Sequence, residues 1–256
     1  MGEPMSREER TQPFREILNS LNRNFRQTTL TNHRQPRRRT APNVYPANKV
    51  WGDNIRRKKT GDVRICYCNI DGLDTSTTNN VSVKNIRTFL NEKQIDIFGA
   101  SEVNINWDMM PRGHHKAKEF FRPDNDDIKI ETAHNIHESF ERRQFGGTMI
   151  MALGEAASFV VEQGVDDTGL GRWSWLLFKG KNNQRTRIII GYRPCRSRRT
   201  QLSTVYAQHT RYFREQRTPK DPRTAFVEDI GAKLAEWIRN GERLIFMANL
   251  FAIQKS

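Results

Sequence analysis

Apolar and polar residues alternate early in the chain in a pattern that predicts a strand, a helix and a second strand. The first strand reads Val63-Arg64-Ile65-Cys66-Tyr67-Cys68, and the second covers residues 95–100. Ser82 can cap the helix between them. Four apolar residues recur there at helical spacing: Val83, Ile86, Phe89 and Leu90. This order predicts two parallel strands joined by a helical crossover.

A run of short strands follows. Apolar segments predict strands at residues 147–153, 158–162, 174–179 and 187–192, and residues 181–183 (Lys-Asn-Asn) predict a hairpin turn between the last two. The chain then returns to one helix and one strand.

The last predicted helix carries clear start and stop signals. Asp221 is a suitable N-cap, Pro222 lies in the first turn, and Gly241 is placed to end the helix. Its apolar stripe consists of Phe226, Ile230, Leu234, Trp237 and Ile238. A final strand is predicted over residues 244–251.

Positive charge concentrates in the first sixty residues. The chain has a formal net charge of +14, and residues 1–60 hold fourteen Lys and Arg against five Asp and Glu. This composition is typical of a disordered segment. We therefore predict a basic, mostly disordered arm over residues 1–60 and a folded domain over residues 61–256. The charge suits a polyanionic partner, DNA or another nucleic acid before an acidic membrane surface.

Two basic clusters lie in the arm: Arg37, Arg38 and Arg39, and then Arg56, Arg57, Lys58 and Lys59. They can attract phosphate groups, and their spacing is similar to that of a bipartite nuclear-import signal. A solvated linker is the alternative. Three cysteines and no apolar secretion segment favour a reducing, intracellular location, nuclear or cytoplasmic. No apolar run has the length of a membrane span, so we expect no membrane partner.

Polar residues follow the first two strands directly. Asn69 comes after the first strand, and Glu102 comes after the second. Parallel strands with a helical crossover end at the same sheet edge, where α/β proteins usually bind ligands. A carboxylate beside an amide is a sensible half-site for Mg²⁺ and a phosphate. Polar strand ends are common, so the pair alone is a weak signal.

Five motifs, in order, resemble those of the endonuclease/exonuclease/phosphatase (deoxyribonuclease-I-like) superfamily, particularly the endonucleases of non-LTR retrotransposons. The matching segments are 69–73 (Asn-Ile-Asp-Gly-Leu), 96–102 ending in Glu102, 146–150 beginning Gly-Gly, 187–194 with Gly-Tyr-Arg-Pro, and 244–251. The resemblance implies an α/β (α+β) four-layer sandwich, in which two β-sheets pack face to face with helices outside.

The resemblance also implies roles for individual residues. Asn69 would lie near the phosphate and the metal, Glu102 would bind Mg²⁺, and Tyr192 would orient the phosphate. Asn249 stands where the family has an aspartate that positions or deprotonates the attacking water, and Phe251 replaces an asparagine that binds phosphate. The family's closing Asp-His pair has no counterpart within these residues. We interpret the domain as C-terminally incomplete and expect little or no activity, because an amide cannot accept the water's proton.

The sequence context predicts roles for several further residues. Arg193, Arg196, Arg198 and Arg199 follow the tyrosine strand, and phosphate-backbone contact is the favoured role for them. We interpret His209 as a surface histidine. Trp173 and Trp175 alternate in a strand, which favours core and rim positions over base stacking.

The favoured function is therefore Mg²⁺-dependent phosphodiester hydrolysis of DNA by a retroelement-type endonuclease relative, weakened or lost in this chain. A non-catalytic nucleic-acid-binding remnant is the first alternative, and a phosphoinositide or small-phosphate phosphatase is the second. The expected partners are nucleic acid and, in a parent element, a missing C-terminal segment or a reverse transcriptase.

Overall fold

A computed structural model describes residues 56–73, 81–110, 115–121, 127–138, 143–197 and 202–249. The contacts of the chain divide it into two units, residues 1–57 and 58–256. Arg56 and Arg57, both exposed, are the residues described in the first unit.

The first sheet has the strand order β1-β2-β4-β3. Its strands are β1 (Ile65–Asn69), β2 (Ile97–Ser101), β3 (Ile128–Ala133) and β4 (Thr148–Leu153). β1 and β2 are parallel, joined through helix α2 (Val81–Glu92), and the other pairs are antiparallel. The predicted parallel pair with a helical crossover is confirmed.

The second sheet has the order β5-β6-β7-β8. Its strands are β5 (Val160–Val165), β6 (Trp173–Lys179), β7 (Arg185–Tyr192) and β8 (Arg243–Asn249). A short 3₁₀ turn, η3 (Lys181–Asn183), joins the antiparallel strands β6 and β7 at the predicted hairpin. β7 and β8 are parallel, joined through the last two helices.

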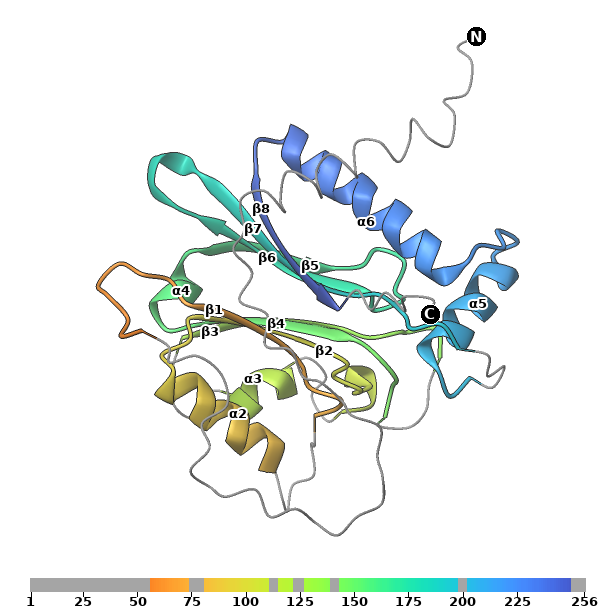
Figure 1. Cartoon of the computed structure of the whole chain (residues 1–256), viewed down its shortest axis with the longest axis horizontal. Helices are drawn as coiled ribbons and strands as arrows, with labels where there is room; N and C mark the ends of the chain where they lie inside the picture. Colours follow the sequence, from red (N-terminus) through yellow and green to blue (C-terminus); the bar gives the residue numbers. More distant parts are fainter. Residues whose placement is uncertain are drawn as a thin grey trace. The chain divides into compact units, whose positions relative to one another are not determined.

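The two sheets pack face to face with helices on their outer surfaces, which confirms the predicted sandwich (Figure 1). Apolar side chains from both sheets fill the space between them, among them Ile97, Ile150, Leu176 and Ile190. The sheets approach closely at Gly99, where a Cβ atom would lie 2.1 Å from Cδ1 of Ile190. A side chain at this position would therefore force the sheets apart.

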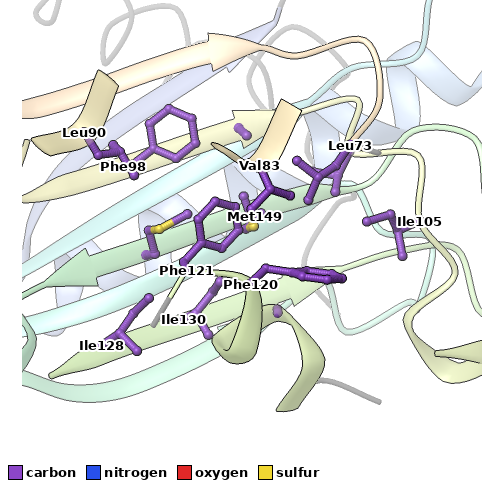
Figure 2. Close-up of a cluster of buried hydrophobic side chains, with 14 of the residues drawn as sticks. Leu73, Val83, Leu90, Phe98, Ile105, Phe120, Phe121, Ile128, Ile130 and Met149 are labelled. Atoms are coloured by element: carbon purple, nitrogen blue, oxygen red, sulfur yellow. The ribbon is translucent and has the colours of Figure 1, made fainter. Parts of the chain in front are cut away.

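Helices α2 and α3 (His115–Phe121) cover the outer face of the first sheet, over a core that Figure 2 shows in detail. Cys66 and Cys68 pack against this core from one face of β1, as predicted. Helix α6 (Pro222–Arg239) lies along the outer face of the second sheet, with α5 (Val205–Glu215) beside it (Figure 1). Trp237 of α6 meets Trp175 of β6 with ring centroids 5.9 Å apart.

The helix signals of α6 are confirmed. The Asp221 carboxylate accepts hydrogen bonds from the backbone N–H groups of Arg223 and Thr224, at 3.0 and 2.9 Å. Pro222 is the first helical residue, and Gly241 follows the helix with a φ of 76°. Among the described residues, no helix is both long and apolar enough to cross a membrane.

Two predicted boundaries are wrong. Helix α2 begins at Val81, so Ser82 lies inside its first turn instead of capping it. The strand predicted at 158–162 begins with Ser158 in a one-turn helix, α4 (Glu155–Ser158), and β5 starts only at Val160. The backbone N–H of Phe159 closes this turn on the carbonyl of Ala156, which local apolar spacing does not reveal.

Candidate functional site

The carboxyl ends of the two parallel strand pairs carry the site residues predicted from the sequence. Asn69 ends β1 opposite Ser101, and Glu102 follows β2 directly. In the other sheet, Tyr192 ends β7 opposite Asn249, the last residue of β8. Parallel pairing places the last residues of two strands about 4.8 Å apart. Each sheet therefore brings two of the four predicted residues together.

Glu102 and Tyr192 come from different sheets and line the same pocket. Burial and the negative charge of Glu102 raise the pKa of Tyr192 far above its ordinary value. The hydroxyl thus keeps its proton and can donate a hydrogen bond. A half-buried tyrosine, Tyr67, lies nearby: its hydroxyl is 2.8 Å from Ser101 Oγ, and burial raises the pKa of Tyr67 to about 12.

A pocket of about 230 Å³ opens beside this pair. Its lining includes Glu102, Tyr192 and Asp71 together with two arginines, Arg143 and Arg196. The lining is completed by Asn104, Phe145, Gly146, Cys195, Ser197, Thr204, Val205 and Tyr206. The pocket thus combines carboxylates, a neutral hydroxyl donor and guanidinium groups, a set that suits a metal-assisted phosphate site.

The backbone at the pocket adopts an uncommon conformation. Asp71, Glu102 and Asn104 all have positive φ angles, 49°, 55° and 58°. Non-glycine residues rarely adopt this conformation, and it concentrates at functional sites. Hydrogen bonds hold it in place: Gly72 N–H donates to the Glu102 carbonyl at 2.7 Å, and Gly146 N–H donates to Asn104 Oδ1 at 2.8 Å.

Gly146 has a steric reason to be glycine. Its φ is 83°, and a Cβ atom there would lie 2.9 Å from Val205 Cγ2 and 3.1 Å from Tyr192 Cε1. The absence of a side chain therefore lets the Tyr192 ring lie against the backbone that precedes β4. The Gly-Gly motif seen in the sequence thus contributes to the position of the candidate phosphate-binding tyrosine.

Asp71 and Glu102 are the carboxylates in the pocket lining that could hold a divalent cation. Mg²⁺ commonly binds proteins through one or two carboxylates and keeps several waters, so this donor set fits a weakly held, hydrated ion. No group of three or more His, Cys, Asp or Glu suited to a metal occurs in the described part of the chain. Asn69 is exposed, and its Oδ1 accepts a hydrogen bond from the Asp71 N–H at 3.1 Å, so it orders the turn that presents Asp71.

Asn249 is buried at the end of β8, and no described residue forms a hydrogen bond with its Nδ2. The backbone next to it is fixed, because its carbonyl accepts a hydrogen bond from the Arg193 N–H at 3.3 Å. An amide at this position can orient a ligand but cannot take up a proton near neutral pH. Phe251 lies outside the described residues.

The arginines predicted to contact phosphate have different surroundings in the structure. Arg196 lines the pocket. Burial lowers the pKa of Arg193, and the neighbouring cations Arg223 and Arg196 lower it further. Its Nε is buried without an acceptor. Arg223, which the sequence analysis did not single out, donates from Nη1 to the Pro194 carbonyl at 3.1 Å. Such a cation cluster is suited to an anion.

The structure describes only some of the other residues that were predicted to contact nucleic acid. Arg37, Arg38, Arg39, Arg198 and Arg199 lie outside the described residues, whereas Arg56, Arg57 and Lys59 are exposed. Lys58 is half-buried and forms an ion pair with Asp96 at 2.5 Å, which ties the start of the domain to the strand that leads to Glu102.

The interpretation of His209 as a surface residue is wrong. His209 is fully buried on α5, and its Nε2 lies 3.2 Å from the Leu170 carbonyl. The neighbouring Gln208 is also buried. Its Oε1 accepts from Asn135 Nδ2 and Gln144 Nε2, both at 3.1 Å, and its Nε2 donates to the Leu202 carbonyl at 2.8 Å. This network joins α5 to three segments that are distant in sequence or precede the helix.

Sequence reasoning also missed Asp71 and Arg143. Asp71 stands in the motif at a position where the resembled family has asparagine, and this difference was a usable signal. Arg143 carried no such signal, because tertiary contacts such as the isolated bridge between Arg143 and Ile105 bring its segment to the pocket. The core and rim positions of Trp173 and Trp175 are confirmed, since the first is buried and the second is half-buried.

Comparison with known proteins gives matches to solved structures alone. No family model and no curated protein sequence matches this chain. The chain is similar to an endonuclease/exonuclease/phosphatase family protein from Leptotrichia buccalis, at 12% identity and a TM-score of 0.36, over 56% of each chain. It is similar to D. rerio TDP2 complexed with single-strand DNA product, at 14% identity and a TM-score of 0.40, over 75% of this chain and 62% of that one.

A third similar structure is the human Nocturnin catalytic domain with bound sulfate, at 9% identity and a TM-score of 0.43, over 74% of this chain and 65% of that one. The chain therefore spans less than two thirds of the length of each of these proteins. The superfamily that the sequence motifs resemble is also named among the structural matches, and the likeness is one of fold.

Proposed function

We infer that this chain is a nucleic-acid-binding protein of the endonuclease/exonuclease/phosphatase superfamily, related to the endonucleases of retroelements. The observation that carries this proposal is that Glu102 and Tyr192, two motif residues from different sheets, line one pocket. The ancestral reaction would be Mg²⁺-dependent hydrolysis of a DNA phosphodiester.

Each residue of the pocket has a part in this proposal. Glu102 and Asp71 would hold a hydrated Mg²⁺, which when bound would polarise a phosphoryl oxygen. The Tyr192 hydroxyl would donate a hydrogen bond to a phosphate oxygen. Arg143 and Arg196 would bind flanking phosphates, and Asn69 would keep Asp71 in place.

Asn249 limits the hydrolytic power of this arrangement. Where an aspartate could position water and accept its proton, the amide can only position it. The proposal is therefore that the chain binds nucleic acid and hydrolyses it poorly or not at all. A purely non-catalytic binding role is the second candidate, favoured by the same residue. A phosphatase acting on small phosphates accounts less well for the basic arm.

Residues 1–60 would add sequence-independent affinity through the clusters 37–39 and 56–59. Each phosphate neutralised on duplex DNA contributes about −0.9 to the slope of log affinity against log salt concentration. Deletion of the arm is expected to weaken DNA binding and to flatten this slope. If the slope and the affinity of the shortened chain equal those of the full chain, the arm does not contact DNA.

Matched tyrosine variants test the pocket. Tyr192→Phe removes the hydroxyl proposed to contact phosphate, and Tyr67→Phe removes a buried hydroxyl that bonds to Ser101 Oγ. Fluorescence anisotropy of a labelled DNA duplex in Mg²⁺ should show about tenfold weaker binding for Tyr192→Phe, because a hydrogen bond to a charged group contributes about 1.5–3 kcal/mol. Tyr67→Phe should bind as the unmodified chain does. Equal affinities of all three proteins would show that the Tyr192 hydroxyl does not contribute to DNA binding.

A further inference from the structure

A second cavity lies on the outer face of the second sheet, the face that points away from the first sheet. It has a volume of about 360 Å³, within the size range of small-ligand sites, and it lies between β5–β7 and the last turns of α6. Arg187 in its lining precedes Tyr192 by five residues, about 17 Å along β7. The two side chains leave the strand on opposite faces, so this cavity is separate from the candidate phosphate pocket.

The floor of the cavity is a guanidinium group between two indole rings. Arg187 Cζ lies 3.8 Å from the centroid of Trp175 and 4.5 Å from that of Trp237. The same guanidinium is bidentate with Glu242, from Nε at 2.6 Å and from Nη2 at 2.9 Å. Two tryptophans and a carboxylate would attract a cation, and the Arg187 guanidinium already occupies that place.

Two hydrogen-bond donors in this lining have no acceptor among the residues that the structure describes. The Arg187 side chain is only 4% exposed, yet no described residue pairs with its Nη1 or with the buried Nε of Arg185. Arg185 and Arg187 are two residues apart on β7, so they share one face of the sheet. Unpaired buried donors are unfavourable, and two of them in one cavity indicate that an acceptor from outside the chain fits there.

The rim of the cavity offers the complementary groups. The Glu162 carboxylate, 51% exposed, is held at 2.8 Å by Arg185 Nη2, and Asp167 and Glu236 are paired with Lys233. Three basic and four acidic side chains in the lining nearly balance, which disfavours a highly charged anion. A ligand for this cavity should be uncharged where it binds, planar, and able to present acceptors beside donors.

We propose that this cavity binds a guanine base of single-stranded nucleic acid. Guanine O6 and N7 are acceptors for guanidinium N–H groups, and the same base carries N–H donors for a carboxylate such as Glu162. The binding of a base here does not depend on whether the Glu102 pocket hydrolyses DNA.

Titration of the full chain with nucleotides tests this proposal. The probes are guanosine, adenosine, cytidine and uridine 5′-monophosphates and ribose 5-phosphate, and the readouts are tryptophan fluorescence and calorimetry. Guanosine monophosphate is expected to bind about tenfold more tightly than the pyrimidine nucleotides, since one bidentate base contact gives discrimination of this order or more. Equal binding of all five probes would show recognition of the phosphate and would overturn the proposal, as would no detectable binding at millimolar concentration.

Single-residue variants locate the binding. Glu162→Gln and Arg185→Gln change half-exposed side chains at the cavity, and each should weaken guanosine monophosphate binding about tenfold while the melting temperature changes little. Lys220→Gln, at an exposed ion pair with Glu228 near the start of α6, is the matched control and should bind normally. Unchanged binding in both Glu162→Gln and Arg185→Gln would place the nucleotide outside this cavity and refute the proposal.

Discussion

The buried imidazole of His209 predicts that the folded protein loses stability in mild acid. The pKa of His209 is lowered from 6.5 to about 3, chiefly because the imidazole is completely buried. The nearby Arg172 guanidinium and, more weakly, His137 also lower it, whereas Asp166 and the hydrogen bond to the Leu170 carbonyl raise it. The Nδ1 atom has no partner among the described residues, so a second proton would leave an unpaired N–H in the core.

The sign of the effect follows from proton binding. Below pH 6.5 the unfolded chain takes up a proton on this residue, whereas the folded chain does so only near pH 3. The contribution to stability is therefore complete above pH 6.5 and is lost as the pH falls toward 3. One pH unit in this window corresponds to about 1.4 kcal/mol, so the free energy of unfolding should fall by roughly 3 kcal/mol between pH 7 and pH 4.5 through this residue.

Urea denaturation of the unmodified chain and of His209→Gln at a series of pH values measures this term. The amide of glutamine can keep the hydrogen bond to Leu170 but cannot be protonated, so the variant should lose roughly 3 kcal/mol less between pH 7 and pH 4.5. Phe213→Leu, a buried change on the same helix without a titrating group, should shift the curve equally at every pH. Parallel curves for the unmodified chain and His209→Gln would refute the reasoning.

Two further predictions concern the packing around the candidate pocket. Gly146→Ala should lower the free energy of unfolding by about 2–4 kcal/mol, because it adds close contacts to the cost of a positive φ. Gly61 also has a positive φ, but nothing lies within 4 Å of a Cβ there. Gly61→Ala should therefore lower the free energy of unfolding by only about 1–2 kcal/mol in the same urea experiment. Gln208→Leu leaves three buried groups unpaired and should cost about 3 kcal/mol or more, whereas the exposed Gln163→Leu should cost under about 1 kcal/mol. Equal losses within either pair would contradict the structural reason given for it.

The sequence predicted the helices and strands that bury one apolar face. The βαβ unit, the β6–β7 hairpin and α6 follow from periodicity and from end signals such as Asp221, which the structure confirms. Helix α5 was missed because polar residues occupy its buried face. Gln208 and His209 are buried there through hydrogen bonds that join them to distant segments, and hydrophobic periodicity does not register such a face.

The candidate site was predictable in part for a related reason. Residues at strand ends, such as Glu102 and Tyr192, are placed by topology, and topology follows from the order of elements. Arg143 lies in a connecting segment whose path depends on tertiary contacts, including the Gln144–Gln208 hydrogen bond. The strand β3 was missed because only two of its buried residues, Ile128 and Ile130, are large and apolar; the other two are Thr132 and Ala133.

The central claim is that the pocket at Glu102 and Tyr192 binds nucleic-acid phosphates and that Asn249 leaves it little hydrolytic power. The most direct measurement incubates the chain with supercoiled plasmid in Mg²⁺ and scores binding by gel shift and nicking after the protein is removed. The account predicts bound, intact plasmid, with weaker binding by Arg143→Gln and Arg196→Gln. Nicking that disappears in Glu102→Gln would contradict the assignment of Asn249, and plasmid binding that is unchanged in both arginine variants would contradict the assignment of the pocket.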